Sequence, residues 1–268
     1  MQNARIINME KFISYSQLDD LILFDIFNGI NNGFYIDVGA NNPWAGSVTK
    51  VLYDRGFHGI NIEPLLDEYR LLQLDRPRDI TLCLAAGDKE GELTFYQMGP
   101  LSTLNDAVLE QAVRDGKTCS ITKVPITTLA KICKEYIPPQ QEIHFCKIDV
   151  EGYEKEVLLG MNWDYRPHVF IIESTEPRTN TPTYYKWEGI LLENGYKYVL
   201  SNGVNRFYVD INMKNNLKFL DISELLNKYD VRYSSKIRYV KNIVKNPKII
   251  PQLLFYVIKH RADIMHKY

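Results

Sequence analysis

The feature that most constrains the fold of this chain is a short apolar run that ends at a glycine, in residues 34–41 (Phe-Tyr-Ile-Asp-Val-Gly-Ala-Asn). A short apolar run bounded by a turn residue is typical of a buried strand. Comparable runs follow at residues 59–62, 80–84, 143–150 and 169–173. Helical patterns lie beside them, at residues 17–30, 46–56, 65–74, 127–136, 152–159 and 184–194. This alternation predicts an α/β fold with a doubly wound, mostly parallel sheet.

Further strands are expected outside these runs. Residues 197–200 and 206–209 form an expected antiparallel pair around an Asn-Gly turn, which would close the sheet. Residues 91–97 alternate like an exposed strand and open an insertion that ends at about residue 123.

The charge of the chain is unevenly distributed, although its net charge at neutral pH is −1. Residues 211–268 hold 12 Lys and Arg against 4 Asp and Glu, and contain expected helices at 217–229 and 249–265. The basic segment suits a lid or dimer arm, an amphipathic membrane-surface segment, or a docking surface for a partner enzyme. Nucleic acid is disfavoured as a partner, because the rest of the chain is acidic and would repel phosphates. We therefore divide the chain into an N-terminal helical segment (1–30), an α/β domain (31–210) and a basic helical C-terminal extension (211–268).

Cysteine usage and the N-terminus bear on the compartment. The four cysteines, at positions 83, 119, 133 and 146, form no C-x-x-C pair, which favours buried thiols in a reducing environment over a zinc site. The first 20 residues lack the apolar core of a signal peptide. No apolar run reaches the roughly 18 residues that span a bilayer. We therefore expect a cytoplasmic protein, with peripheral contact at the inner face of the membrane as one option for the extension.

The turn after the first strand has the features of a nucleoside site. Gly39 allows backbone dihedrals and a close ligand approach that a side chain forbids, and Ala40 and Asn41 continue this turn toward the next helix. Glu63 ends the second strand, 26 residues after Asp37. A carboxylate at that place accepts the hydroxyls of a ribose, because ligands of open parallel sheets bind beyond the carboxyl ends of the strands.

The glycine spacing distinguishes between nucleoside cofactors. A dinucleotide site shows G-x-G-x-x-G, whereas here no glycine follows Gly39 until Gly46. The carboxylate of Asp37 is unfavourable beside a pyrophosphate and favourable beside the ammonium of a methionine moiety. The turn therefore predicts S-adenosylmethionine. We place its adenine at the turn after the third strand, formed by Ala86, Gly87 and Asp88. Two alternatives stay open: an NAD-dependent sugar-modifying enzyme, and a non-catalytic cofactor-binding subunit.

Charged residues end the fourth and fifth strands, where a buried strand is normally apolar. Lys147, Asp149 and Glu151 alternate in the fourth, so an extended strand places them on one side, and Glu173 ends the fifth. Because buried charges are unfavourable unless they are paired or used, we assign these four residues a catalytic role. One of them would act as general base toward a hydroxyl acceptor, or Asp149 and Glu173 would hold a divalent cation. The structural alternative is an ion-pair network around Lys147.

Four segments together resemble the FkbM-type methyltransferases: residues 34–41, 61–64 (Asn-Ile-Glu-Pro), 85–91 (Ala-Ala-Gly-Asp-Lys-Glu-Gly) and 147–154 (Lys-Ile-Asp-Val-Glu-Gly-Tyr-Glu). The resemblance covers roughly residues 30–210. It implies a Rossmann-like class I methyltransferase fold, S-adenosylmethionine as the donor, and usually an O-methyl product. Members often act on sugar hydroxyls of surface glycans, so polysaccharide modification is implied. The family often reads Thr-Leu-Asp-Asp where this chain has Thr128, Leu129, Ala130 and Lys131.

Overall fold

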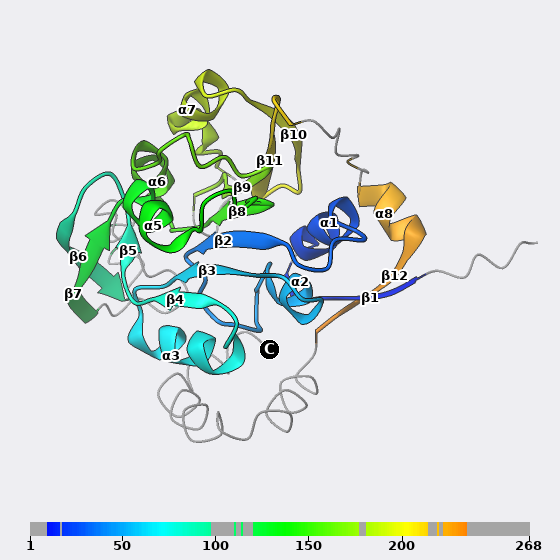
Figure 1. Cartoon of the computed structure of the whole chain (residues 1–268), viewed down its shortest axis with the longest axis horizontal. Coiled ribbons are helices and arrows are strands. Elements are labelled where there is room, and N and C mark those ends of the chain that lie inside the picture. The colour runs from blue at the N-terminus through cyan, green and yellow to red at the C-terminus, as the bar shows by residue number, and fades with distance from the viewer. Residues whose placement is uncertain are drawn as a thin grey trace, which may run out of the picture.

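A seven-stranded sheet forms the centre of the computed structural model (Figure 1). The structure describes residues 10–16, 18–97, 110, 114, 120–176, 181–213, 219 and 222–234. Across the sheet the strands are β10 (Tyr196–Ser201), β11 (Asn205–Asp210), β9 (Val169–Glu173), β8 (Phe145–Ile148), β2 (Phe34–Val38), β3 (His58–Ile62) and β4 (Ile80–Leu82). The strands from β9 to β4 are parallel, and β11 is antiparallel to both of its neighbours. The predicted doubly wound, mostly parallel sheet is confirmed, including its closing antiparallel pair.

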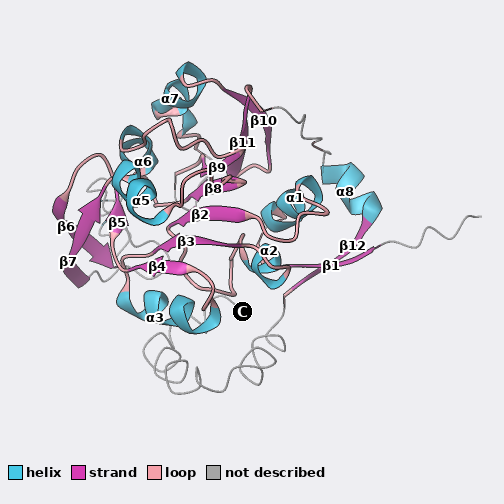
Figure 2. Ribbon diagram, viewed as in Figure 1, coloured by secondary structure: helices cyan, strands magenta, loops and turns pink. Residues whose placement is uncertain are grey.

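Alternate residues of the central strands face two different helical layers. Ile36, Ile148 and Ile172 pack in one core with α5 (Leu129–Tyr136), α6 (Glu154–Leu159) and α7 (Glu188–Glu193). Tyr35 and Phe145 face the other core, with α1 (Asp19–Ile26) and α2 (Lys50–Asp54). A further helix, α3 (Leu66–Asp75), lies beside the edge strand β4 (Figure 2). Because helices cover both faces, the central strands are mostly apolar, as in other parallel sheets.

The helices fall within the predicted ranges, with two exceptions. The helix α3 ends one residue later than expected, and residues 184–194 divide into a 3₁₀ helix, η1 (Tyr184–Lys186), and α7. The helix α2 is much shorter than the predicted 46–56, because the loop before it makes hydrogen bonds of its own. The Asn42 side chain accepts from the backbone N–H groups of Trp44 and Ala45, both at 3.0 Å. Such local bonds compete with helix formation.

A second, three-stranded sheet consists of β5 (Ala85–Ala86), β7 (Ser120–Thr127) and β6 (Gly91–Gln97). The predicted strand at 91–97 is confirmed, and it pairs antiparallel with β7. The insertion therefore ends in a strand that reaches Thr127, past residue 123. The predicted helix starts only at Leu129, where the Thr128 side chain caps it by accepting from the backbone N–H of Lys131.

The N-terminal segment and the C-terminal extension meet in a two-stranded parallel sheet that sequence patterns did not predict. The strand β1 (Glu10–Ser14) pairs with β12 (Tyr229–Tyr233), which follows α8 (Ile222–Lys228). This pair lies on the opposite side of the main sheet from β6 and β7 (Figure 1). The predicted helix at 249–265 lies outside the described residues, and the three-part division of the chain stays a prediction. In the described part of the chain, no helix has the length and apolar character that a membrane crossing requires.

Candidate functional site

The carboxyl ends of β2 and β8 mark the point where the strand order reverses. From β2 the chain continues to β3 and β4 on one side, and later crosses to β8 and β9 on the other. In open α/β sheets, ligands bind in the crevice at such a switch point. Asp37 and Lys147 occupy the same rung of the sheet here, so the two predicted site residues lie side by side.

Gly39 brings the two strand ends into direct contact. It has a positive φ of 75°, and a Cβ at this position would stand 1.9 Å from the backbone oxygen of Asp149. Any side chain would therefore push the β2 turn and the β8 turn apart. The glycine predicted to admit a ligand thus also allows the glycine turn to lie against the acidic strand end.

Lys147 connects this glycine turn to two carboxylates. Its Nζ donates to the Gly39 backbone oxygen at 2.9 Å, and lies 3.4 Å from Asp37 Oδ1 and 3.3 Å from Asp149 Oδ2. Burial alone would lower the pKa of Lys147, but the charges of Asp37 and Asp149 raise it above its ordinary value. The ammonium is therefore protonated at neutral pH and has no free lone pair. This geometry favours the ion-pair role of Lys147 over a role as general base.

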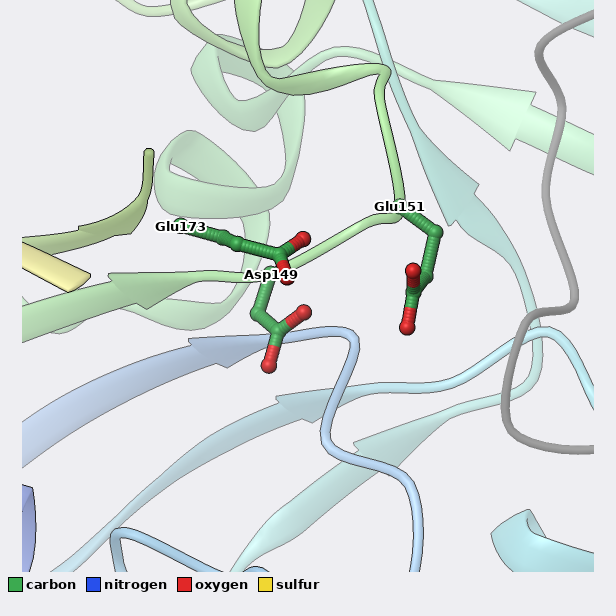
Figure 3. Close-up of side chains that lie close together, drawn as sticks. All are labelled: Asp149, Glu151 and Glu173. Carbon is green, nitrogen blue, oxygen red and sulfur yellow. The ribbon is translucent and has the colours of Figure 1, made fainter. Parts of the chain in front are cut away.

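Three carboxylates face a common space beyond β8 and β9 (Figure 3). Asp149, Glu151 and Glu173 each offer an oxygen, and these oxygens lie within 4.8 Å of one another. Glu173 Oε2 is buried and has no hydrogen-bond partner among the described residues. Burial, followed by the charges of Asp149 and Glu151, raises the pKa of Glu173 far above its ordinary value. A carboxyl group in this state binds a proton more strongly than an ordinary glutamate does.

The backbone after β8 turns sharply and so corrects the expectation of an extended strand to residue 151. The strand ends at Ile148, and Glu151 and Gly152 have positive φ angles of 53° and 97°. Glu154 Oε1 closes the turn by accepting from the backbone N–H groups of Val150 (3.3 Å) and Gly152 (3.0 Å). Glu151 therefore reaches the space near Asp149 through a left-handed backbone rather than through strand alternation.

Glu63 lies against the glycine turn, as its place at the end of β3 predicted. Its two carboxylate oxygens accept from the backbone N–H groups of Asn41 and Leu65, each at 2.8 Å. Burial raises the pKa of Glu63 to about 8. Each oxygen accepts one of these bonds, so a second lone pair on each is available for a hydroxyl group.

A family model described as the methyltransferase FkbM domain matches residues 37–198. The chain belongs to this family. Membership of the FkbM methyltransferases implies S-adenosylmethionine as the methyl donor, in agreement with the prediction from the glycine turn.

Two solved structures are similar to this chain. One is the methyltransferase FkbM from Methylobacillus flagellatus KT, with 16% identity and a TM-score of 0.40 over 67% of this chain. The other is a TehB-like SAM-dependent methyltransferase from Corynebacterium glutamicum ATCC 13032 Kitasato, with 7% identity and a TM-score of 0.39 over 72% of this chain. The similar regions cover 44% and 87% of those chains, so this chain spans less than half of the first. No curated protein sequence matches it.

The residues of the candidate site fit S-adenosylmethionine. The bare Gly39 backbone and the free lone pairs of Glu63 suit a methionine moiety and a ribose respectively. Asp37 is only 1% exposed, and its Oδ2 accepts from Thr49 Oγ1 at 3.0 Å. Direct contact between Asp37 and the cofactor therefore stays a prediction. The structure does show that Asp37 contacts Thr49 and Lys147, which lie beside the turn.

The structure supports the predicted adenine turn only in part. Ala86 is buried in β5, and a Cβ on Gly87 would stand 3.0 Å from the Tyr153 ring. Asp88 is exposed. Gly87 thus lets Tyr153 pack against this turn, a contact that the sequence did not reveal.

A hollow of about 340 Å³ lies elsewhere on the molecule. Its lining residues are Leu84, Glu90, Gly91, Pro125, Ile126, Thr127, Lys131, Ile132, Glu135 and Tyr136. None of the predicted site residues lines it. We place the chemistry at the carboxyl edge instead, because the glycine turn and the carboxylates converge there.

One buried carboxylate of the carboxyl edge escaped sequence reasoning. Asp19 at the start of α1 is 2% exposed, and it accepts from the side-chain amides of Asn202 (2.7 Å) and Asn205 (2.9 Å). Asn205 pairs with Glu173 across the sheet. Burial raises the pKa of Asp19 to about 7. Its only sequence signal was an acidic residue at a helix N-terminus, which the helix dipole explains equally well.

Proposed function

We propose that the chain is an S-adenosylmethionine-dependent O-methyltransferase that methylates a sugar hydroxyl of a surface glycan or related glycoconjugate. The observation that carries this proposal is the position of the three carboxylates Asp149, Glu151 and Glu173 beside the glycine turn. The carboxylates and the cofactor turn lie at the same switch point. This arrangement suits methyl transfer to a hydroxyl group, which must lose a proton in the reaction.

A hydroxyl group is a weak nucleophile until its proton is removed, so a positioned base accelerates the transfer. S-adenosylmethionine supplies the electrophilic methyl group. We assign Glu173 Oε2 as the proton acceptor, because this atom has no hydrogen-bond partner among the described residues. Burial and the neighbouring carboxylates raise the pKa of Glu173 and so favour its protonated form, which cannot accept a proton. Positive charge brought to the site lowers that pKa and so frees the carboxylate to act as a base. Asp149 and Lys147 hold the turn in place.

The same three carboxylates support a second chemical route. A hard divalent cation prefers oxygen ligands of this kind, and it lowers the pKa of a bound hydroxyl group. Treatment with EDTA distinguishes the two routes: loss of activity that Mg²⁺ or Mn²⁺ restores identifies the cation route, and unchanged activity favours the route without a cation.

Cofactor binding is tested by thermal unfolding with S-adenosylhomocysteine and with NAD. We expect S-adenosylhomocysteine to stabilise the fold by about 2.7 kcal/mol at one hundred times its Kd, and NAD to leave the unfolding temperature unchanged. An absence of binding by S-adenosylhomocysteine, or stabilisation by NAD alone, contradicts the proposal.

Catalysis is tested with Glu173→Gln and Asp149→Asn. We expect Glu173→Gln to bind S-adenosylhomocysteine normally and to lose about 10²–10⁴-fold in kcat, the usual contribution of a general base. Glu193→Gln, the same chemical change at the exposed end of α7, is the matched control.

The acceptor is identified by mass spectrometry of the surface glycan from cells with and without the protein. Identical glycan masses in the two samples exclude this acceptor class.

A further inference from the structure

A fully buried arginine, Arg76, follows α3 and lies under the loop that continues the glycine turn. It is 0% exposed. Its Nη2 donates to the Pro43 backbone oxygen at 2.7 Å and to Ser47 Oγ at 3.0 Å, and its Nη1 donates to Thr49 Oγ1 at 3.2 Å. One guanidinium group thus holds three points of the loop between β2 and α2. A buried charge with this many partners needs an explanation beyond packing.

The bonds continue from this loop into the cofactor turn. Thr49 Oγ1 accepts from Arg76 and donates to Asp37 Oδ2 at 3.0 Å. Asp37 Oδ1 in turn lies 3.4 Å from Lys147 Nζ, which donates to the Gly39 backbone oxygen. The orientation of the Thr49 hydroxyl is therefore fixed, because it must accept on one side and donate on the other.

The other side of Arg76 is anchored to the strands that carry the site. Its Nη1 also donates to Tyr35 Oη at 3.3 Å, and Tyr35 donates to Asp79, which accepts from the Asn61 side chain at 2.8 Å. Asn61 lies two residues before Glu63 on β3. The arginine thus connects the two halves of the cofactor site, the glycine turn after β2 and the carboxylate after β3.

The charge balance keeps Arg76 ionised. Burial alone would lower the pKa of Arg76, but Tyr35, Asp75 and Asp79 raise it above its ordinary value. Asp75 Oδ2 lies 3.1 Å from Arg76 Nε and 3.1 Å from Lys50 Nζ. A planar guanidinium group donates in several fixed directions at once, whereas a lysine ammonium on a flexible chain does not reproduce that fork.

We propose that Arg76 is a positioning residue of the cofactor site, which acts through Thr49 and Asp37 to hold the glycine turn in its binding shape. The proposal rests on the proposed function, since it concerns the same S-adenosylmethionine site. It differs from a purely structural role in one measurable respect. A structural role changes the unfolding temperature alone, whereas a positioning role changes affinity for the cofactor.

The test compares Thr49→Val, Thr49→Ser and Arg76→Lys with the wild-type chain. Calorimetry gives the Kd of S-adenosylhomocysteine, thermal unfolding gives stability, and methyl transfer gives KM and kcat where an acceptor is known. Thr49→Val keeps the shape of the side chain and removes the hydroxyl, so we expect Kd to rise about tenfold, the loss of one hydrogen bond to a charged group. Thr49→Ser restores the hydroxyl and should bind as the wild type does. Thr94→Val on the exposed side of β6 is the matched control.

The outcomes separate this inference from the proposed function. If the wild-type chain does not bind S-adenosylhomocysteine, the proposed function fails and this inference fails with it. If the wild-type chain binds and Thr49→Val binds equally well, Arg76 has only a structural role and the inference is overturned. Thr49→Val decides the matter even where Arg76→Lys does not fold.

Discussion

Two glycines of one loop have nearly the same backbone and very different surroundings. Gly39 and Gly46 have φ angles of 75° and 76°. A Cβ on Gly39 would collide with the Asp149 backbone oxygen, whereas a Cβ on Gly46 would meet no atom within 4 Å. Both positions therefore favour glycine because of their backbone conformation. Only Gly39 also needs glycine for the close approach between the turns after β2 and β8.

We expect Gly39→Ala to abolish binding of S-adenosylhomocysteine and Gly46→Ala to preserve it. Both variants carry the left-handed strain of about 1–2 kcal/mol that a side chain adds, but only Gly39→Ala also moves the acidic strand end. Calorimetry and thermal unfolding on both variants measure the difference. Equal affinity in the two variants would show that the approach to Asp149 is unimportant for the site.

Site residues that are marked by their position at a strand end could be predicted from the sequence. Residues whose role depends on long-range contacts could not. Gly39, Glu63, Asp149 and Glu173 could be placed because strand ends in a parallel sheet share one edge. Arg76 gave no such signal, because nothing in the local sequence shows that a charged residue after a helix will be fully buried. Its partners are fixed only when the loop before α2 folds over it.

At the scale of elements, the parallel pair of β1 and β12 joins segments far apart in the chain. Glu10 pairs with Tyr229, and Ser14 with Tyr233. Each strand has five residues. The first (Glu-Lys-Phe-Ile-Ser) has no period-two pattern, and the second (Tyr-Asp-Val-Arg-Tyr) alternates over only five residues, directly after a helical pattern. Residue 229 was accordingly assigned to the end of a helix. The core strands were predictable because each is a continuous apolar run. The strands β1 and β12 contain no such run.

We expect Tyr229→Ala to unfold this end of the molecule. The centroid of the Tyr229 ring lies 6.0 Å from that of Phe12 and 5.8 Å from that of Phe24. The Tyr229 hydroxyl donates to Asp25 at 2.7 Å. Removing a buried aromatic ring costs about 3–5 kcal/mol, which lowers the unfolding temperature by about 2–4 °C per kcal/mol. Tyr233→Ala, on the same strand but 63% exposed, is the control for thermal unfolding.

An equal loss of stability in both variants would mean that the pairing of β1 and β12, rather than the Tyr229 ring, supplies the stability. Tyr229→Phe adds a further comparison, because it keeps the ring and removes only the hydrogen bond to Asp25. We expect it to lose about 1.5–3 kcal/mol, the usual contribution of a hydrogen bond to a charged group.

At the scale of the whole molecule, the carboxyl edge gathers buried carboxyl groups from segments spread along the chain. Asp19 comes before the first core strand, Glu63 follows β3, and Glu154 and Glu173 belong to the α6 and β9 region. The sequence predicted the place where the β-strand ends meet, but not that this edge would bury Asp19. Burial is a property of the assembled fold, since it depends on the Asn202–Asn205 turn closing over α1.

These buried carboxyl groups predict how the stability of the fold depends on pH. Burial raises the pKa of Asp19 and Glu154 to about 7, and that of Glu63 to about 8, whereas unfolded carboxyl groups titrate at about 4. Between these values the folded chain binds more protons than the unfolded chain, so the stability that these three groups contribute is fully present below about pH 4 and is lost as pH rises through 7 to 8. His144 and His168 have lowered pKa values and act in the opposite sense, but only in the acidic range.

The window from pH 6.5 to 8 therefore isolates the carboxyl groups. We expect the unfolding temperature of the wild-type chain to fall across this window, and Glu63→Gln to flatten the fall near pH 8, since a glutamine has no proton to lose. Glu193→Gln should keep the wild-type slope. A wild-type unfolding temperature that does not fall with pH in this window would mean that these groups are already ionised in the folded chain. In that case burial at the carboxyl edge would not raise the proton affinity of these carboxyl groups.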